Sequence, residues 1–320
     1  MPEYNLNARA EALVRGLVAD KDGLGVEVSI LPEGSLLVDA GIKCPGSLEA
    51  GRRLAEICLG GLGRVELVQL FFGDFWLPGV QVTIQQPALA CIASQYAGWA
   101  VKGEGFFALG SGPARALAAR EGVFQTLGYR EKGPVGVLVL ETRKVPPGPV
   151  VQEVASTCGI DPENLSLLVA PTASLAGSVQ VAARVVETGL HKLMELGYDI
   201  TRVTAAFGTC PLAPVAASDL EAIGRTNDGV LYGGRCFYTV ADPGEEITEI
   251  LPRVPALASR DYGTPFLRLL EQYGDFYGID PLLFSPAEVI INNTATGVVH
   301  QAGRVEPELL KESLLGVAKD

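Results

Sequence analysis

Apolar and polar positions change their period several times along the chain. From Asn7 onward, apolar residues recur every three to four positions, which predicts an amphipathic helix capped by Asn7. Residues 26–30 then alternate between apolar and polar, and a Pro-Glu-Gly turn separates them from the apolar stretch 36–40, so this segment predicts a β-hairpin. A second helix is expected from Ser47 to the glycine pair that begins at Gly60, because glycine adopts the left-handed conformation that ends helices.

Two continuous apolar runs, Val135–Leu140 and Leu165–Ala170, predict buried strands. Between them lies Lys144–Pro149, with the sequence KVPPGP, whose prolines and glycine disfavour both helix and sheet pairing. We take this segment as the boundary between an N-terminal α/β lobe, residues 1–143, and a C-terminal α/β lobe, residues 144–320. Either lobe can be discontinuous in sequence.

Beyond Pro171 the pattern predicts one long helix over Ala173–Leu196 and another over Asp219–Leu231. Further strands are expected at Val203–Phe207, Arg235–Val240, Ala287–Asn293 and Gly297–Gln301. Strands and helices mix without regular βαβ alternation, and two hairpins are expected. The sequence therefore predicts the α+β class, with mixed sheets, rather than a doubly wound parallel sheet.

Composition narrows the classes of protein. Hydrophobic residues make up 48% of the 320 residues and charged residues 19%, which excludes disorder for most of the chain. The net charge is −12, and no basic cluster is longer than Arg52-Arg53, so nucleic acid is not an expected partner. No apolar run approaches the about 20 residues that a membrane span needs. The N-terminal segment lacks the cationic start and apolar centre of a signal peptide, so we expect a cytoplasmic protein that does not bind membranes.

Cysteine and histidine are scattered, without a Cys-x-x-Cys pair or a histidine beside a cysteine. Zinc sites need such ligands at close spacing, so no metal site is predicted. We expect the cysteines to be reduced and buried, as is usual in the cytosol. These residues are Cys44, Cys58, Cys91, Cys158, Cys210 and Cys236, with His191 and His300.

Three glycine-rich loops, at residues 59–63, 110–113 and 232–235, have the composition of anion-binding turns. None fits the phosphate-binding loop or the dinucleotide fingerprint, and caps or tight turns explain each of them equally well. The middle loop is the strongest candidate. Backbone N–H groups at the start of a helix that opens at Pro113 could bind an anion, with Arg115 one turn further on.

The long predicted helix carries a polar stripe at spacings of four, three and four residues: Gln180, Arg184, Glu187 and His191. One interpretation is a solvated face with a weak Arg–Glu pair. The other is a carboxylate, Glu187, held ionised by Arg184 and suited to activating water. Spacing alone does not choose between them. Two histidines also make a Ser–His or Cys–His nucleophile improbable.

Six irregular strings follow one another along the chain: Gly46–Gly63 (GSLEAGRRLAEICLGGLG), Ser94–Trp99 (SQYAGW), Gly110–Ala116 (GSGPARA), Leu168–Gly189 (LVAPTASLAGSVQVAARVVETG), Thr226–Arg235 (TNDGVLYGGR) and Tyr262–Phe266 (YGTPF). In this order they resemble the methenyltetrahydromethanopterin cyclohydrolase family. Chance or a shared superfold would not reproduce several long strings in one order. The correspondence is weakest in Glu66–Gly79 and in the last ~20 residues, where we transfer nothing.

The resemblance implies an enzyme of one-carbon metabolism, also found in methanogenesis, that reversibly hydrolyses the methenyl bridge of a reduced pterin carrier to the formyl form. The carrier is tetrahydromethanopterin or a dephospho variant. The family implies a homotrimer of soluble subunits, two α/β lobes with a cleft between them, and no metal or prosthetic group. Its catalytic glutamate corresponds to Glu187, and the arginine that partners it corresponds to Arg184.

The residues agree with that chemistry. A methenyl bridge is an amidinium cation whose central carbon is already electrophilic, so a base for water and a negative potential for the cation suffice. Glu187 could supply both, and Arg184 would orient it. Substrate-binding roles are expected in the matching strings, for the anionic tail of the carrier or for the donor and acceptor edge of the pterin, at Ser94, Gln95, Ser111, Arg115, Thr226, Asn227 and Tyr232.

Two other classes stay open at this point. A non-catalytic pterin carrier would bind the cofactor without converting it, and the presence of both Arg184 and Glu187 argues against it. A phosphate-binding transferase is disfavoured because no nucleotide fingerprint is complete. The sequence does not determine the physiological direction of the reaction, the carrier variant or the contacts of the trimer.

Overall fold

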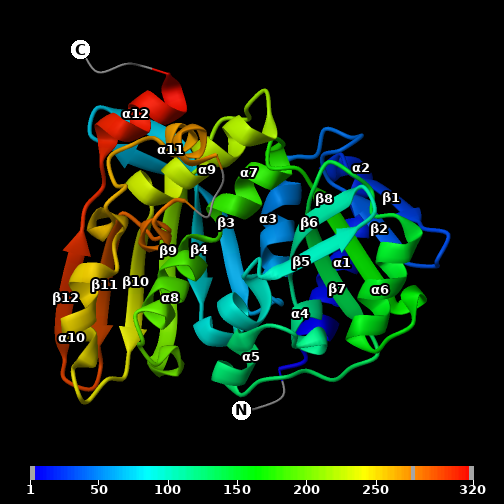
Figure 1. Ribbon diagram of the computed structural model, residues 1–320, viewed down its shortest axis with the longest axis horizontal. Helices are drawn as coiled ribbons and strands as arrows, with labels where there is room; N and C mark the ends of the chain where they lie inside the picture. Colours follow the sequence, from blue (N-terminus) through cyan, green and yellow to red (C-terminus); the bar gives the residue numbers. More distant parts are fainter. Residues whose placement is uncertain (1–3, 275–277, 317–320) are drawn as a thin grey trace. The chain divides into compact units, whose positions relative to one another are not determined.

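The computed structural model describes residues 4–274 and 278–316 (Figure 1). The chain divides into two compact units, and each is built from two separate stretches. The first unit comprises residues 1–64 and 89–180, and the second comprises residues 65–88 and 181–320. Each unit contains one six-stranded sheet together with helices, which confirms the α+β class and the mixed sheets.

The sheet of the first unit has the strand order β1-β2-β8-β7-β6-β5. Strands β2, β8 and β7 run parallel at its centre, whereas β1–β2 and β5–β6–β7 pair antiparallel. The hairpin and the two buried central strands confirm the sequence-based predictions. The strands are β1 (Glu27–Ile30), β2 (Leu36–Asp39), β5 (Trp99–Gly103), β6 (Phe106–Ser111), β7 (Gly136–Glu141) and β8 (Leu165–Ala170).

The pairing of β7 with β8 places the expected lobe boundary inside one sheet. The division predicted between residues 143 and 144 falls between these two strands, which hydrogen-bond to each other in parallel inside the first unit. The Pro-rich segment 144–149 leads directly into helix α6 (Gly148–Cys158), which packs on the same sheet. In the structure this segment is therefore the loop of a β–α–β crossover, which has the same local composition as a linker.

Helices cover both faces of the sheet of the first unit. Helices α1 (Leu6–Ala19) and α3 (Leu48–Cys58) pack on one face, while α4 (Ala114–Ala118) and α6 pack on the other. Every residue of β8 and the first five residues of β7 are accordingly buried. The remaining helices are α2 (Lys21–Leu24), α5 (Gly122–Leu127), α7 (Leu175–Ala182), a π-helix at Ala88–Gln95 and a 3₁₀ turn at Pro162–Asn164.

The start of α1 differs from the prediction. Asn7 is not the cap but lies inside the helix, fully buried, with its side chain bonded to the backbone of Pro113 and Val137. The free N–H groups of Leu6 and Asn7 instead donate to the carboxylate of Glu131, both at 2.9 Å. The prediction was wrong because the capping group comes from a residue more than a hundred positions away, which no local pattern reveals.

The sheet of the second unit has the strand order β12-β11-β10-β9-β4-β3. Strand β9 pairs antiparallel with β4 and with β10, and β11 pairs antiparallel with β12, whereas β10 and β11 are parallel. The four strands predicted in the C-terminal half are confirmed. The strands are β3 (Gly63–Phe72), β4 (Phe75–Ile84), β9 (Val203–Pro211), β10 (Arg235–Val240), β11 (Glu288–Asn293) and β12 (Val298–Gly303).

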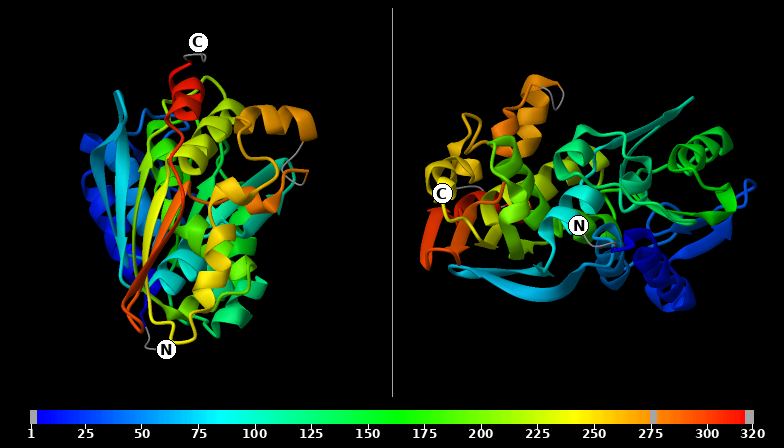
Figure 2. Two further views of the ribbon diagram at one scale, coloured as in Figure 1. Left: turned by 90° about the vertical axis from the view of Figure 1, so that its left-hand side faces the viewer. Right: turned by 90° about the horizontal axis from the view of Figure 1, so that it is seen from below.

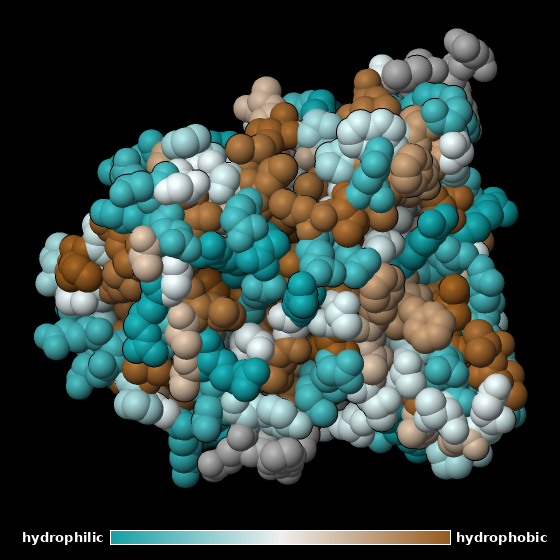
Figure 3. All heavy atoms as spheres, turned by 180° about the vertical axis from the view of Figure 1, so that it is seen from behind, coloured by the Kyte–Doolittle hydropathy of each residue, from teal (hydrophilic) through white to brown (hydrophobic). Residues whose placement is uncertain are grey.

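Only one face of this second sheet is covered by helices of its unit, as the right-hand view of Figure 2 shows. Along β10, Cys236, Tyr238 and Val240 are buried toward α8 (Val185–Glu195), whereas Phe237 between them is 37% exposed. Figure 3 shows hydrophobic side chains among hydrophilic ones on the opposite, open side. The other helices are α9 (Asp219–Gly233), α10 (Glu246–Ile250), α11 (Phe266–Tyr273) and α12 (Pro307–Leu315), with 3₁₀ turns at Ile200–Arg202, Leu251–Arg253, Ala256–Ala258 and Pro281–Leu283.

The single long helix predicted over Ala173–Leu196 is two helices. Helix α7 ends at Ala182, α8 begins at Val185, and Arg184 stands between them with φ −81° and ψ 0°. Helix α7 contributes to the core of the first unit through Ala176, whereas α8 packs on β9 and β10 of the second. The apolar pattern continues through this segment and does not show that its first and second halves pack in different cores. The prediction therefore missed the break between α7 and α8.

Candidate functional site

The pair formed by Arg184 and Glu187 lies at the beginning of α8. Arg184 Nη1 is 4.0 Å from Glu187 Oε2, and the two residues are only 9% and 4% exposed. Glu187 lies in the first turn of the helix, where the partial positive charge of the helix N-terminus favours a carboxylate. The pair is thus a buried ion pair and not part of a solvated helix face, which removes the first of the two interpretations of the polar stripe.

Strand β10 fixes the position of that first turn. The hydroxyl of Tyr238 donates a 2.8 Å hydrogen bond to the carbonyl oxygen of Val186, and the thiol of Cys236 contacts the carbonyl oxygen of Val185 at 3.2 Å. One turn later, a Cβ on Gly189 would lie 2.2 Å from the Tyr238 hydroxyl, so only glycine allows this approach. The backbone around Glu187 is therefore held against the sheet, which is a requirement for a precisely placed catalytic group.

The other two members of the stripe lie on different helices. Gln180 is buried near the C-terminus of α7, and it belongs to the first unit. His191 is half-buried on α8, with Nε2 3.8 Å from an oxygen of Glu195 one turn further along that helix. Four residues at helical spacing are thus not four residues on one helix, because α7 ends at Ala182 and α8 begins at Val185.

In the first unit the structure brings Ser94, Ser111 and Arg115 into one buried network. The hydroxyl of Ser94 donates to the carbonyl oxygen of Cys58 at 2.6 Å, and the Cys58 sulfur lies 3.5 Å from the Ser111 hydroxyl. Gln95, the next residue after Ser94, is fully buried at the end of the π-helix. The network connects the C-terminus of α3 with the end of β6.

Arg115 is the centre of that network. It is fully buried, and its Nε and Nη2 atoms donate to the two carboxylate oxygens of Glu121 at 2.9 and 2.6 Å. Nη1 donates to the carbonyl oxygens of Ile92 and Ser94, both at 3.0 Å, and the guanidinium lies 5.2 Å from the ring centroid of Tyr96. A guanidinium with this set of internal partners stabilises the fold, and the expectation that Arg115 binds an anionic tail stays a prediction.

The glycine-rich loop before Arg115 is also occupied by internal contacts. The N–H of Gly112 donates to the carbonyl oxygen of Ser94 at 2.8 Å, and Ser111 is 1% exposed. The helix that follows, α4, has only five residues. The interpretation as a tight turn, rather than as an anion-binding loop, agrees with these contacts.

The three candidates on α9 lie in the second unit. The hydroxyl of Thr226 donates to the carbonyl oxygen of Ala222 at 2.8 Å, which is a bond within the helix. Asn227 is half-buried and donates through Nδ2 to the carbonyl oxygen of Ile223 at 2.9 Å. Of the three, Asn227 is the one with partial exposure, and it keeps a carbonyl oxygen that can accept a hydrogen bond.

Tyr232 is fully buried, and its hydroxyl donates to the carbonyl oxygen of Thr264 at 2.8 Å. Its ring lies 5.3 Å from that of Tyr262. The neighbouring carboxyl of Asp228 accepts from the N–H of Phe266, the first residue of α11, at 2.9 Å. Tyr232 and Asp228 therefore join the strings TNDGVLYGGR and YGTPF to each other, and the expectation that Tyr232 meets the pterin stays a prediction.

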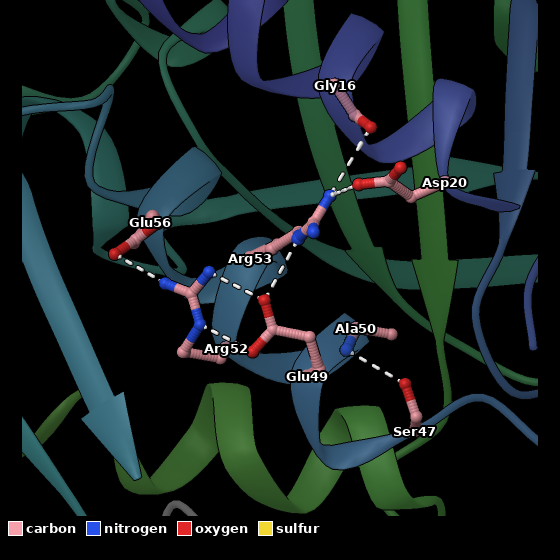
Figure 4. Close-up of polar contacts among 8 residues, drawn as sticks. All are labelled: Gly16, Asp20, Ser47, Glu49, Ala50, Arg52, Arg53 and Glu56. Carbon is pink, nitrogen blue, oxygen red and sulfur yellow. Dashed lines mark hydrogen bonds and ion pairs between the residues drawn. The ribbon is translucent and has the colours of Figure 1, made fainter. Parts of the chain in front are cut away.

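The string GSLEAGRRLAEICLGGLG forms α3, and its polar residues stabilise that helix (Figure 4). Ser47 caps it by accepting from the N–H of Ala50 at 3.0 Å, as predicted. Arg53 bridges the carboxylates of Glu49 and of Asp20, the residue that follows α1, at 3.0 and 2.6 Å. A Cβ on Gly51 would lie within 2.9 Å of three atoms of α7, so the helices touch there. This string is explained by packing.

The carboxyl ends of the parallel strands carry a polar pair that the sequence analysis missed. Glu141 ends β7, and Thr172 follows two residues after the end of β8. The Thr172 hydroxyl donates to the carboxylate of Glu141, which is half-buried. Ligands of α/β sheets bind preferentially beyond such strand ends, and a polar residue that directly follows a continuous apolar run was the signal that could have identified Glu141.

Over residues 4–274 and 278–316, no group of three or more His, Cys, Asp or Glu side chains has the geometry to hold a metal ion. The six cysteines are free thiols, five of them buried and Cys44 half-buried. No helix in the described part of the chain is long and apolar enough to cross a membrane.

Comparisons with known proteins show the family to which the chain belongs. A family model described as Cyclohydrolase (MCH) matches residues 5–314. A methenyltetrahydromethanopterin cyclohydrolase of Xanthobacter autotrophicus is 47% identical over 98% of this chain and 94% of its own length. A protein of the same name from Methanocaldococcus jannaschii is 42% identical over 97% of this chain and 98% of its own length. The chain is an enzyme of the hydrolase class and belongs to the methenyltetrahydromethanopterin cyclohydrolase family, which confirms the resemblance.

Proposed function

We propose that this protein hydrolyses the methenyl bridge of methenyltetrahydromethanopterin, or of a dephospho variant, to the formyl form in one-carbon metabolism, and catalyses the reverse condensation. Near-full-length similarity to relatives of that name supports the reaction. The observation in the structure that carries the proposal is the buried Arg184–Glu187 pair at the start of α8. The subunit acts in the cytoplasm, with the pterin carrier as its small-molecule substrate.

Glu187 is the general base in this proposal. Its carboxylate takes a proton from the water that attacks the amidinium carbon, and its negative charge stabilises the cationic centre as the substrate approaches. The attack forms a C–O bond and neutralises the amidinium. Collapse of the resulting adduct breaks one C–N bond and leaves the formyl group on one nitrogen. The proton held by Glu187 passes to the nitrogen that leaves, and the proton of the adduct's hydroxyl group is released to solvent as the C=O bond forms, so each turnover releases one proton.

Arg184 is a positioning residue in the same proposal. At 4.0 Å from the carboxylate its guanidinium attracts Glu187 and favours its ionised form. In the proposal this attraction orients the carboxylate toward the attacking water. Of the residues expected to bind substrate, Asn227 remains a proposal on the grounds of its exposure. Ser94, Gln95, Ser111 and Thr226 are buried, and their substrate-binding roles stay predictions.

One assay separates this function from the two other classes. The purified protein is mixed with the methenyl carrier alone, and the methenyl chromophore is followed by absorbance. A cyclohydrolase removes the chromophore catalytically without a second substrate. A carrier protein would change it only stoichiometrically, and a transferase would need a co-substrate, so either result would contradict the proposal.

The proposed mechanism uses no metal and no prosthetic group, because the substrate is already a cation and needs no Lewis acid. Activity should therefore survive extensive dialysis against EDTA. A rate that falls to background after chelation and returns on addition of zinc would contradict this part of the proposal. Dialysis with a zinc-dependent hydrolase in parallel verifies that the chelation was effective.

We also propose that the subunits form a homotrimer. The open face of the second unit's sheet supports this, because it presents apolar side chains without a helix to cover them, among them Phe207, Phe237 and Val299. Sedimentation equilibrium at micromolar concentration should give three times the subunit mass. Phe237→Lys should shift the equilibrium toward monomers, whereas Leu220→Lys, at an exposed position of α9, should not. A monomeric wild type would contradict the trimer.

A further inference from the structure

Part of the first unit's sheet is left uncovered on the face that carries α1 and α3. The buried cluster beneath these helices includes Val137 and Val139 of β7, but no residue of β5 or β6. Side chains two residues apart on a strand point to the same face, so Glu141 continues the row of Val137 and Val139. Glu141 thus lies where the cover of the helices ends.

The strand next to β7 presents large apolar side chains on the same face. Leu109 of β6 is the register partner of Glu141, and Phe107 lies two residues before Leu109. Leu109 is 40% exposed and Phe107 is 58% exposed. The alternate residues of the strand, Phe106 and Ala108, are buried on the other face. Directly opposed residues have Cβ atoms about 4.5–5.5 Å apart, so the Leu109 side chain lies beside the Glu141 carboxylate.

Thr172 holds that carboxylate in one orientation. Its hydroxyl donates to Oε1 of Glu141, and Thr172 itself is 4% exposed. A carboxylate has about four acceptor positions on its two oxygens, so both oxygens can still accept bonds from a ligand. The result is an apolar floor of Leu109 and Phe107, bordered by a fixed, half-buried carboxylate at the carboxyl end of parallel strands.

This combination matches one kind of ligand. The pyrimidine half of a pterin is flat, and its edge carries a ring N–H and an exocyclic amino group side by side. Two parallel donors fit the two oxygens of one carboxylate, in the manner of a bidentate guanidinium. The flat ring can pack on an aromatic and an aliphatic side chain at the same time. An anionic ligand would be repelled by Glu141, and a purely apolar one would leave it unpaired.

We propose that Glu141, together with Leu109 and Phe107, recognises the pyrimidine edge of the pterin, and that Thr172 positions the carboxylate. This inference deepens the proposed function and rests on it for the identity of the substrate. Glu141 is then a substrate-recognition residue that takes no part in proton transfer. Loss of its charge should weaken binding and leave the chemical step nearly unchanged.

The kinetic test compares Glu141→Gln with Glu104→Gln. The control removes the same charge from an exposed position in the β5–β6 turn of the same unit. Glutamine keeps the acceptor for Thr172, so the local fold is retained. We expect Glu141→Gln to raise KM by about tenfold or more, the scale of one lost charge-assisted hydrogen bond, and to keep kcat within about threefold. Glu104→Gln should match the wild type.

The second pair of variants tests the positioning role. Thr172→Val removes the hydroxyl at nearly constant volume and should raise KM by several-fold, whereas Thr172→Ser keeps the donor and should restore the wild-type KM. Leu109→Ala should also raise KM without changing kcat, because it removes part of the apolar floor. Equal KM values for Glu141→Gln and Glu104→Gln would overturn the inference.

A binding measurement separates this inference from the proposed function. Calorimetric titration with 6-methyltetrahydropterin, which lacks the tail and the methenyl bridge, reports on pterin recognition alone. We expect weaker binding by Glu141→Gln than by the wild type and by Glu104→Gln. If the wild type did not convert the methenyl carrier, the proposed function would fail, and this titration would still decide whether Glu141 binds a pterin. Equal affinities for all three proteins would overturn the inference.

Discussion

The two sheets of this protein have the same number of strands but different surroundings. In the first unit, helices pack on both faces, and the central strands β7 and β8 are almost continuously apolar. In the second unit, β10 and β11 alternate between buried and more exposed residues, because helices cover one face only. A continuous run of apolar residues therefore indicates a strand with helices on both faces of its sheet. Alternation of buried and exposed residues indicates a strand whose sheet has one face without helices.

The residues with proposed functions also differ between the two units in how helices cover them. In the second unit, the buried Arg184–Glu187 pair is carried by a helix that lies on the covered face of the sheet. In the first unit, Glu141 and the exposed side chains of β6 lie where helical cover ends. We therefore expect substitutions in the second unit's pair to change turnover, and substitutions at the first unit's strand end to change binding.

The largest effect is expected for Glu187→Gln. The variant keeps the size of the side chain but loses its basicity and charge, and general-base catalysis typically contributes about 10²–10⁴-fold. We expect kcat to fall by at least about two decades, with KM changed much less and the oligomer intact. Arg184→Ala should also slow turnover, because the base is then misoriented.

Glu195→Gln is the matched control, since it removes the same charge from an exposed position of the same helix. It should retain the wild-type rate. A Glu187→Gln enzyme that works within roughly threefold of wild type would leave the proposed mechanism without a base.

Adjacent positions on one strand test the difference in cover directly. Leu167 and Leu168 of β8 are both fully buried, one toward each layer of helices. Leu167→Ala and Leu168→Ala should each lower the free energy of unfolding by about 2–5 kcal/mol. On β11, Ile291→Ala should cost a similar amount, but Ile290→Ala, on the open face, much less.

Chemical denaturation at several protein concentrations measures these costs. If the open face forms the trimer interface, the cost of Ile290→Ala should grow with protein concentration, because it then acts through assembly. The costs at Leu167 and Leu168 should not depend on concentration in this way. Equal costs at Ile290 and Ile291 in the monomer would contradict the one-sided cover of the second sheet.

A smaller effect is expected for Glu131, whose carboxylate caps α1 in the first unit. Glu131→Ala leaves the N–H groups of Leu6 and Asn7 without this acceptor and should lower the free energy of unfolding by about 2 kcal/mol. Glu131→Gln keeps one acceptor and should lose less. Hydrogen exchange should accelerate in α1 for the alanine variant, and unchanged protection there would show that the cap is dispensable.

The last effect depends on pH and concerns Asp228 in the second unit. Burial raises the pKa of this carboxyl to about 7, from 3.8, although Ser313 and the Phe266 N–H oppose the shift. Between these values the folded state holds a proton that the unfolded state has lost. The stability that the group contributes is therefore full below pH 3.8 and is lost as the pH rises through about 7.

Asp228→Asn removes this titration, and its amide can accept from Phe266 and donate to Ser313. Relative to the variant, the wild type should lose up to about 4 kcal/mol of unfolding free energy between pH 4 and 8, since the pKa shift spans about three units and each is worth about 1.4 kcal/mol. Denaturation curves at both pH values measure the difference. A pH-independent difference would show that Asp228 does not titrate in this range.

Much of the fold and part of the site were predictable from local pattern. The β1–β2 hairpin, strand β8 and the Ser47 cap follow from period, turn residues and capping chemistry within a few positions. The proposed roles of Arg184 and Glu187 come from a long string shared with a family. Arg115 and Tyr232 lie in equally specific strings, but burial shows that they stabilise the structure.

The sequence by itself therefore determined the burial pattern of the strands and the α+β class, because both depend on the local period of apolar residues. It also determined the family, because long strings of residues identify it. Tertiary structure decided which residue caps α1, where the long apolar helix breaks and which charged side chains are buried. The Leu6 N–H and the Glu131 carboxylate that accepts it are 125 positions apart, and α7 and α8 separate because each packs on a different core. Such contacts depend on distances in space, which a local pattern of apolar and polar residues does not encode.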